Sequence, residues 1–109
     1  MRAVPFALPV LLAAAAASAA ADGPPEPRRS EIVNMVRQDC GSCHGLTMKG
    51  GLGPPLVPEA VAAKDPELMR AIILHGLRGT PMPPWRPFLT DDEAMFVVQL
   101  LKKGLPDER

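Results

Sequence analysis

The sequence predicts an all-α protein with a single small folded domain. The chain has 109 residues, a length typical of one domain. Apolar side chains recur at helical spacing within residues 31–40, 66–75 and 91–103, whereas no stretch alternates convincingly between polar and apolar residues. The second and third of these stretches also begin with capping residues and end at a glycine. We therefore expect three to four short helices, joined by loops rich in glycine and proline.

The first 21 residues are typical of a secretory signal peptide. Arg2 provides a positive charge, an alanine-rich apolar run follows, and small residues at 18–21 suit a cleavage site. Cleavage after Ala19 and cleavage after Ala21 both fit the pattern, and we favour Ala21. The apolar run is shorter than the roughly 20 residues that span a bilayer. This length favours a secreted protein over one that keeps a membrane anchor.

Residues 22–29 contain three prolines and no large apolar side chain. We expect them to form a flexible, mobile arm ahead of a folded domain at 30–109. Removal of residues 1–21 leaves 88 residues with 11 basic and 12 acidic side chains, a balance that gives no reason to expect nucleic acid as a partner. Such a short domain has a small core and often needs a cofactor for stability.

The first predicted helix leads into the most informative motif of the chain. A helix is expected at 31–40, with Ser30 as its N-cap. Three apolar residues share one face of this helix with Cys40: Ile32, Val33 and Val36. The helix would therefore present the Cys40 thiol from the same face that it buries.

Cys40-Gly41-Ser42-Cys43-His44 contains both cysteines of the chain, and the pattern C-x-x-C-H is typical of covalent haem attachment. Two thiols at this spacing can each add to a haem vinyl group. The imidazole of His44 can then bind the iron from one side as an axial ligand. One covalently attached haem c is the expected cofactor.

Three other interpretations of the motif remain. A thioredoxin-type disulfide needs a strand before the cysteines and a helix after them, whereas here a helical pattern precedes and a glycine-rich loop follows. A structural zinc site needs four ligands, and His75 is the one further candidate beyond the motif. The third interpretation is a chance spacing of two thiols and a histidine.

The loop at 45–58 contains four glycines and three prolines, which excludes a regular element. It could be a simple surface loop. However, a stiff loop directly after His44 is expected to cover the same side of the haem. A ligating histidine normally donates its other N–H to a carbonyl group, and the carbonyl of Pro54 is the expected acceptor.

A short helix at 59–63 and a longer one after Asp65 are expected next. Asp65 is a suitable N-cap, with Pro66 at the first helical position and Gly76 as the stop signal. Four apolar residues form the expected buried stripe: Leu68, Met69, Ile72 and Ile73. His75 lies in the last turn.

Met82 lies between Pro81 and Pro83 in a proline-rich loop, so it cannot be inside a helix. A methionine held this rigidly is a poor core residue, because methionine usually fills cores by its flexibility. We expect its thioether to be the second axial ligand of the iron. A hydrophobic loop anchor is the alternative role, and His75 is the rival ligand. Trp85, three residues further on, is expected to pack against the haem.

The other methionines are less suitable ligands. Met48 follows His44 too closely to reach the opposite face of the haem easily, while Met69 and Met95 lie in helical patterns and are expected in the core.

The last predicted helix has the strongest signals. Thr90 and Glu93 form a capping box, and Gly104 ends the helix. Four residues make up its apolar face, Ala94, Val97, Val98 and Leu101, and two more broaden it, Phe96 and Leu100.

Together these features resemble the class I c-type cytochromes, over essentially the whole chain after the signal peptide. Four strings are similar, more narrowly, to cytochrome c55X, a small periplasmic cytochrome associated with the cytochrome cd1 nitrite reductase of denitrifying bacteria: Cys-Gly-Ser-Cys-His-Gly-Leu, Gly-Gly-Leu-Gly-Pro-Pro-Leu, Ile-Leu-His-Gly and Thr-Pro-Met-Pro-Pro-Trp. The resemblance implies a small class I cytochrome c fold whose first and last helices cross. It also implies thioether bonds at Cys40 and Cys43, and axial ligation by His44 and Met82. The aromatic residue that many members carry in the last helix corresponds at most to Phe96.

With both axial positions filled, no iron site is left for a substrate, and a His/Met pair raises the reduction potential. We therefore expect an electron carrier rather than an enzyme: a periplasmic monomer with transient redox partners, which donates electrons to nitrite reductase. The alternative is an accessory or maturation factor for the haem of that reductase. A thiol–disulfide enzyme is a third possibility, which covalent haem would exclude.

The basic side chains of the two expected haem loops suggest how a partner docks. Four residues supply the positive charge: Lys49, Arg70, Arg78 and Arg86. A basic rim around the haem edge would meet an acidic patch on the partner. Alternatively, Arg78 or Arg86 pairs with a haem propionate.

Overall fold

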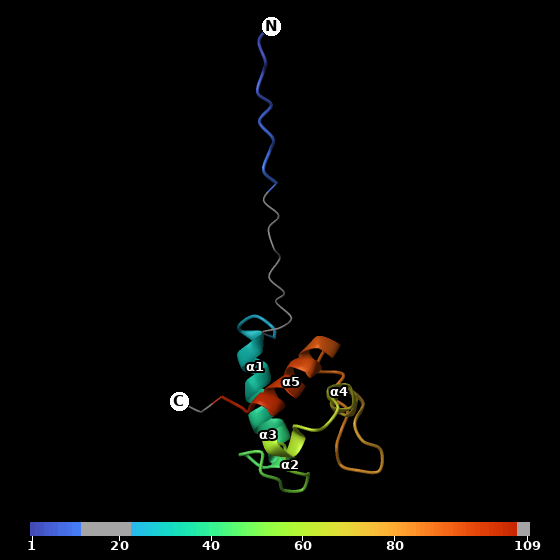
Figure 1. Cartoon of the computed structure of the whole chain (residues 1–109). Helices are drawn as coiled ribbons and strands as arrows, with labels where there is room; N and C mark the ends of the chain where they lie inside the picture. The colour runs from blue at the N-terminus through green and yellow to red at the C-terminus, as the bar shows by residue number, and fades with distance from the viewer. Residues whose placement is uncertain (12–22, 107–109) are drawn as a thin grey trace.

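The computed structural model describes residues 1–11 and 23–106, and within these residues the chain forms helices and no strand (Figure 1). The expected all-α class is therefore confirmed. The elements in order are α1 (Arg28–Met35), the π-helical turn η2 (Val36–Cys40), α2 (Gly41–His44), α3 (Pro58–Val61), α4 (Pro66–His75) and α5 (Asp91–Lys103). The predicted signal-peptide cleavage site lies outside the described residues.

The first helix is longer than the sequence suggests. The segments α1, η2 and α2 follow one another without a break from Arg28 to His44. Ser30 is not the N-cap; its hydroxyl donates a hydrogen bond to Glu26 Oε2 at 2.7 Å. The helix begins earlier because Arg29 N and Glu31 N donate to the carbonyls of Pro25 and Pro27, both at 3.2 Å. The expected arm therefore ends before Arg28, not after residue 29.

α4 begins and ends as expected. The Asp65 carboxylate accepts hydrogen bonds from the first-turn amides, and Gly76 ends the helix with φ +73°, a conformation that a Cβ would strain. The buried face is rotated from the expected stripe, because Met69 and Leu74 are buried whereas Leu68 is 58 % exposed. The prediction that Leu68 is a core residue is wrong for the chain alone.

α5 confirms its sequence prediction closely. Thr90 Oγ1 accepts from Glu93 N at 3.1 Å, and Glu93 Oε1 accepts from Thr90 N at 3.0 Å, which completes the capping box. All four residues of the expected apolar face are buried: Ala94, Val97, Val98 and Leu101.

The core is built around α5, which contacts α1, α3 and α4 (Figure 1). The expected crossing of the first and last helices is present. The buried apolar side chains from the other elements are Ile32, Val36, Met48, Val61, Met69, Leu74 and Leu89. At the start of the folded part, a Cβ on Gly23 would lie 2.4 Å from Phe96 Cδ2. The backbone of Gly23 therefore lies directly against α5, and this part of the arm contacts the domain.

Lys102 connects α5 to the end of α3. Its ammonium group donates hydrogen bonds to the carbonyls of Val61, Ala62 and Lys64 at 2.9, 3.2 and 2.7 Å. Carbonyls at a helix C-terminus lack partners within the helix, and the Lys102 bonds supply partners there; Val61 O also accepts from Lys64 N at 3.0 Å.

Lys102→Met should lower the free energy of unfolding by about 1–3 kcal/mol, because it keeps the apolar stem and removes three charge-assisted hydrogen bonds to carbonyls, of which the one to Val61 is partly buried. Lys103→Met is the matched control, since Lys103 is exposed in the same helical turn. Its effect should stay within about 0.5 kcal/mol. Chemical denaturation of both variants would measure the difference, and equal effects would contradict this role for Lys102.

Among the described residues, no helix has the length and apolar character required to cross a bilayer.

Candidate cofactor site

The motif residues lie at the end of the continuous first helix. Cys40 is the last residue of η2, while Cys43 and His44 lie in α2. Gly45 then turns the chain away with φ +93°. Both cysteines are half-buried free thiols. Two thiols and one imidazole are therefore presented from two successive turns of one helix.

The two thiols have different surroundings. Burial, followed by the charge of the neighbouring Asp39, raises the pKa of Cys40 to about 11. Cys40 is therefore a protonated thiol at neutral pH. The Sγ of Cys43 instead lies 3.9 Å from the Ser42 hydroxyl, which itself donates to the Asp39 carbonyl at 2.7 Å.

The predicted hydrogen bond between His44 and Pro54 is present. His44 Nδ1 lies 2.7 Å from the carbonyl oxygen of Pro54. A carbonyl can only accept, so Nδ1 carries a proton, and in the neutral imidazole Nε2 then has the lone pair that can bind a metal. The loop also binds the end of α2 through its backbone, since Gly50 N donates to His44 O and Gly53 N to Cys43 O, both at 2.8 Å.

Gly53 is a site residue that the sequence did not identify. A Cβ at this position would lie 2.6 Å from His44 Cε1 and 2.7 Å from Nδ1. The loop can therefore cover the imidazole only if this residue has no side chain. Gly51 has a similar constraint, because its Cβ would lie 2.9 Å from the Cys43 carbonyl. The high glycine content of residues 45–58 predicts a loop. The sequence does not indicate, however, which of these glycines contacts the imidazole of His44.

Met82 lies on a different loop, which follows α4. Its amide donates to Thr80 Oγ1 at 3.3 Å, and its carbonyl accepts from Leu77 N at 3.2 Å. Met82 lies outside any helix, as expected, and it is half-buried. The loops after α2 and after α4 both extend toward the same end of the molecule, the lower end in Figure 1.

After Met82, the loop is attached by hydrogen bonds to the C-terminal end of α4. Trp85 N donates to Ile73 O at 2.9 Å and Arg86 N donates to Leu74 O at 3.1 Å, so the loop satisfies carbonyls at the helix C-terminus. Trp85 is half-buried against the core, and its ring centroid lies 5.8 Å from that of Phe88. His75, the rival ligand, is an exposed residue at the end of α4.

Local pairing reduces the expected basic rim. Arg70 forms an ion pair with Glu67, and Arg86 Nη1 lies 3.1 Å from Asp91 Oδ1. Lys49 and Arg78 are exposed. Arg70 and Arg86 therefore each have an acidic partner, and Lys49 and Arg78 are the exposed basic residues of the expected rim outside these ion pairs.

The residues present fit a covalently attached haem. Two free thiols and an imidazole with an available Nε2 form the donor set that the group requires. Five large apolar side chains of residues 23–106 are exposed, and four of them lie in the loops after α2 and α4: Leu46, Leu52, Leu77 and Phe88, with Leu68 on α4. A large apolar group would cover such surface. By contrast, no cluster of three or more His, Cys, Asp or Glu side chains suits a metal ion in the described part of the chain.

Comparison with known proteins gives a consistent result. The family model described as cytochrome c oxidase, cbb3-type, subunit III matches residues 28–101. Cytochrome c55X of Paracoccus denitrificans (strain Pd 1222) is 51 % identical over 82 residues, which cover 74 % of this chain and 80 % of the relative. The solved structure of the c-type cytochrome NirC superimposes with a TM-score of 0.72 and 45 % identity, over 73 % of this chain and 94 % of that chain.

A longer relative contains a similar region as one part. Dihydro-heme d1 dehydrogenase of Pseudomonas aeruginosa (strain PAO1) is 35 % identical over 108 residues. The match covers 99 % of this chain and 20 % of the dehydrogenase.

Proposed function

Because the chain belongs to the cytochrome c55X family of class I c-type cytochromes, we propose that it carries electrons in the periplasm as the donor to a nitrite reductase. Covalently bound haem c comes with membership of this family, and the haem supplies a reversible one-electron couple. The observation that best supports the proposal is the imidazole of His44, which Pro54 orients through Nδ1 beside two free thiols.

The proposed roles follow from the chemistry of each side chain. Cys40 and Cys43 would hold the haem by thioether bonds, and His44 Nε2 would bind the iron. The Met82 thioether, held in its proline-rich loop, would fill the opposite axial position. Trp85 would pack against the haem. With both positions filled by protein, the site favours electron transfer over catalysis. Residues 1–21, as a signal peptide, would direct the chain to the periplasm.

The donor role is tested by mixing the reduced holoprotein with oxidised cd1 nitrite reductase and following oxidation of the haem by absorbance. We expect fast oxidation that slows as salt concentration rises, since charged contacts steer transient redox partners. Two exposed residues outside the ion pairs, Lys49 and Arg78, are the positions where charge removal should reduce the rate. No oxidation by the reductase, with an otherwise redox-active holoprotein, would contradict the donor role.

A second candidate function is favoured by the dehydrogenase relative. Nearly the whole chain matches one fifth of dihydro-heme d1 dehydrogenase. A module that is fused to an enzyme in one protein can serve a similar enzyme as a separate chain. The chain would then act in maturation of the reductase haem. A deletion strain separates the two functions: reductase that lacks its d1 haem supports maturation, and complete but poorly reduced enzyme supports the donor role.

A further inference from the structure

The proposed axial ligands lie on two separate units of the fold. The first unit is the continuous helix Arg28–His44, which carries the thiols and His44 at its C-terminal end. The second unit is α4 with the segment 76–90, which carries Met82 and is attached to α4 through the amides of Trp85 and Arg86. The relative position of the two units determines whether a thioether can stay at the axial position opposite His44.

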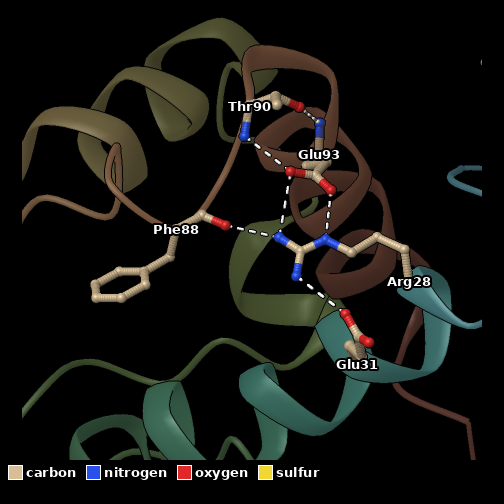
Figure 2. A network of polar contacts seen from close by, with 5 residues as sticks. All are labelled: Arg28, Glu31, Phe88, Thr90 and Glu93. Atoms are coloured by element: carbon tan, nitrogen blue, oxygen red, sulfur yellow. Dashed lines mark hydrogen bonds and ion pairs between the residues drawn. The ribbon is translucent and has the colours of Figure 1, made fainter.

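Arg28, at the start of the first unit, contacts the second unit directly (Figure 2). Its Nη2 donates to the carbonyl oxygen of Phe88 at 2.7 Å. The same guanidinium holds the Glu93 carboxylate on α5, with Nε to Oε2 at 2.6 Å and Nη2 to Oε1 at 3.3 Å. A weaker contact joins Nη1 to Glu31 Oε2 at 3.3 Å on the same helix. One side chain therefore connects α1, α5 and the end of the Met82 segment.

The contact at Phe88 can affect Met82 because the intervening backbone is stiff. Phe88 N and Leu89 N both donate to the Trp85 carbonyl, at 2.9 and 3.0 Å, which makes residues 85–89 a closed turn. Only Pro83 and Pro84 separate this turn from Met82, and each proline ring fixes its φ angle. The backbone between Phe88 and Met82 therefore has few free torsion angles with which to absorb a displacement at Phe88.

We propose that Arg28 is a positioning residue for Met82, which holds the methionine segment against the haem-bearing helix through the Phe88 carbonyl and Glu93. This inference rests on the proposed ligation by Met82. The planar guanidinium suits the role, because its donors point in fixed directions and can serve a carboxylate and a carbonyl together.

The electrostatics of the pair agree with this geometry. The hydrogen bond from Arg28 lowers the pKa of Glu93, and the same bond raises the pKa of Arg28. Because the folded-state pKa of Glu93 lies below its ordinary value of 4.5, the pair contributes its full stability above that pH. The contribution is lost as the pH falls through the folded-state pKa.

The test measures how easily an added ligand displaces Met82. Oxidised holoprotein is titrated with imidazole, and the methionine–iron charge-transfer band reports the displacement. Arg28→Gln should raise the apparent affinity for imidazole about tenfold, because the fraction of iron that has lost Met82 limits binding. Glu31→Gln is the matched control, since it removes the exposed partner of Arg28 and leaves the contacts to Phe88 and Glu93; its affinity should equal that of the wild type.

A second variant keeps the inference testable if Arg28→Gln fails to fold. Glu93→Gln keeps a residue that supports the capping box of α5 but weakens the ion pair, and it should raise the imidazole affinity less than Arg28→Gln does. Circular dichroism checks that the helices remain. The inference would be overturned if Arg28→Gln and Glu93→Gln both bound imidazole with wild-type affinity. It would also be overturned if Glu31→Gln raised the imidazole affinity as much as Arg28→Gln does. A wild-type protein without the methionine band would instead overturn the proposed Met82 ligation itself, and this inference with it.

Discussion

Gly53→Ala is expected to lower the free energy of unfolding of the haem-loaded protein by about 2–4 kcal/mol, as the sum of a close-packed clash and a lost hydrogen bond. The added Cβ would lie 2.6 Å from His44 Cε1. In the chain without haem, the imidazole could turn away and lose only its hydrogen bond to the Pro54 carbonyl. In the holoprotein the iron would also hold Nε2, so the ring could not turn away from the added Cβ.

Gly41→Ala is the matched control for this substitution. Gly41 lies within the C-x-x-C-H motif itself, but its Cβ would have nearest neighbours at 3.5 Å, an ordinary van der Waals contact. It is also helical, so alanine should be neutral or stabilise the protein by about 0.5–1 kcal/mol. Thermal unfolding and haem content, measured for Gly53→Ala and Gly41→Ala, would show whether only the first substitution destabilises the holoprotein. If Gly53→Ala matched Gly41→Ala in the holoprotein, the orientation of His44 by this loop would be disproved.

Features encoded by residues close together in the sequence were predictable. The capping box at Thr90 and Glu93 needs residues three apart, and the structure contains it. The apolar face of α5 follows the helical period, and its four expected residues are buried. The hydrogen bond from His44 to Pro54 joins residues only ten apart through a stiff loop, so chemistry and chain length together limited the choice.

Features that depend on distant segments were not predictable. The sequence around Arg28 predicts a mobile arm, because nothing near this residue indicates a partner. Its partners Phe88 and Glu93 lie 60 and 65 residues further along the chain. Leu68 fits the period of α4, but which side of that helix is buried depends on how it packs against α5. The contact of Gly53 with an imidazole is likewise a property of the folded loop. Local patterns specify the well-capped helices α4 and α5 and their ends, whereas tertiary contacts decide the remainder.

Met82→Ala is expected to remove the methionine–iron charge-transfer band and to lower the reduction potential by an amount on the order of 0.2 V. Axial ligands adjust haem potentials over a range of roughly 0.8 V, and a thioether opposite histidine favours the reduced iron. The structure supports Met82 as the ligand by the way its backbone is held, with Thr80 and Leu77 on one side and the attachment to α4 on the other.

Two controls make the assignment of Met82 specific. His75→Ala removes the exposed rival ligand and should change neither the band nor the potential. Met95→Ala removes a half-buried methionine of α5, whose sulfur accepts a bond from Gln99 at 3.7 Å, and should reduce stability without changing the ligation. A band that persists in Met82→Ala would show that another methionine is the ligand. A potential that responds to His75→Ala, but not to Met82→Ala, would assign the axial position to the histidine. Loss of the band in Met82→Ala alone would assign the second axial position to Met82, and the resulting closed His/Met site favours an electron carrier.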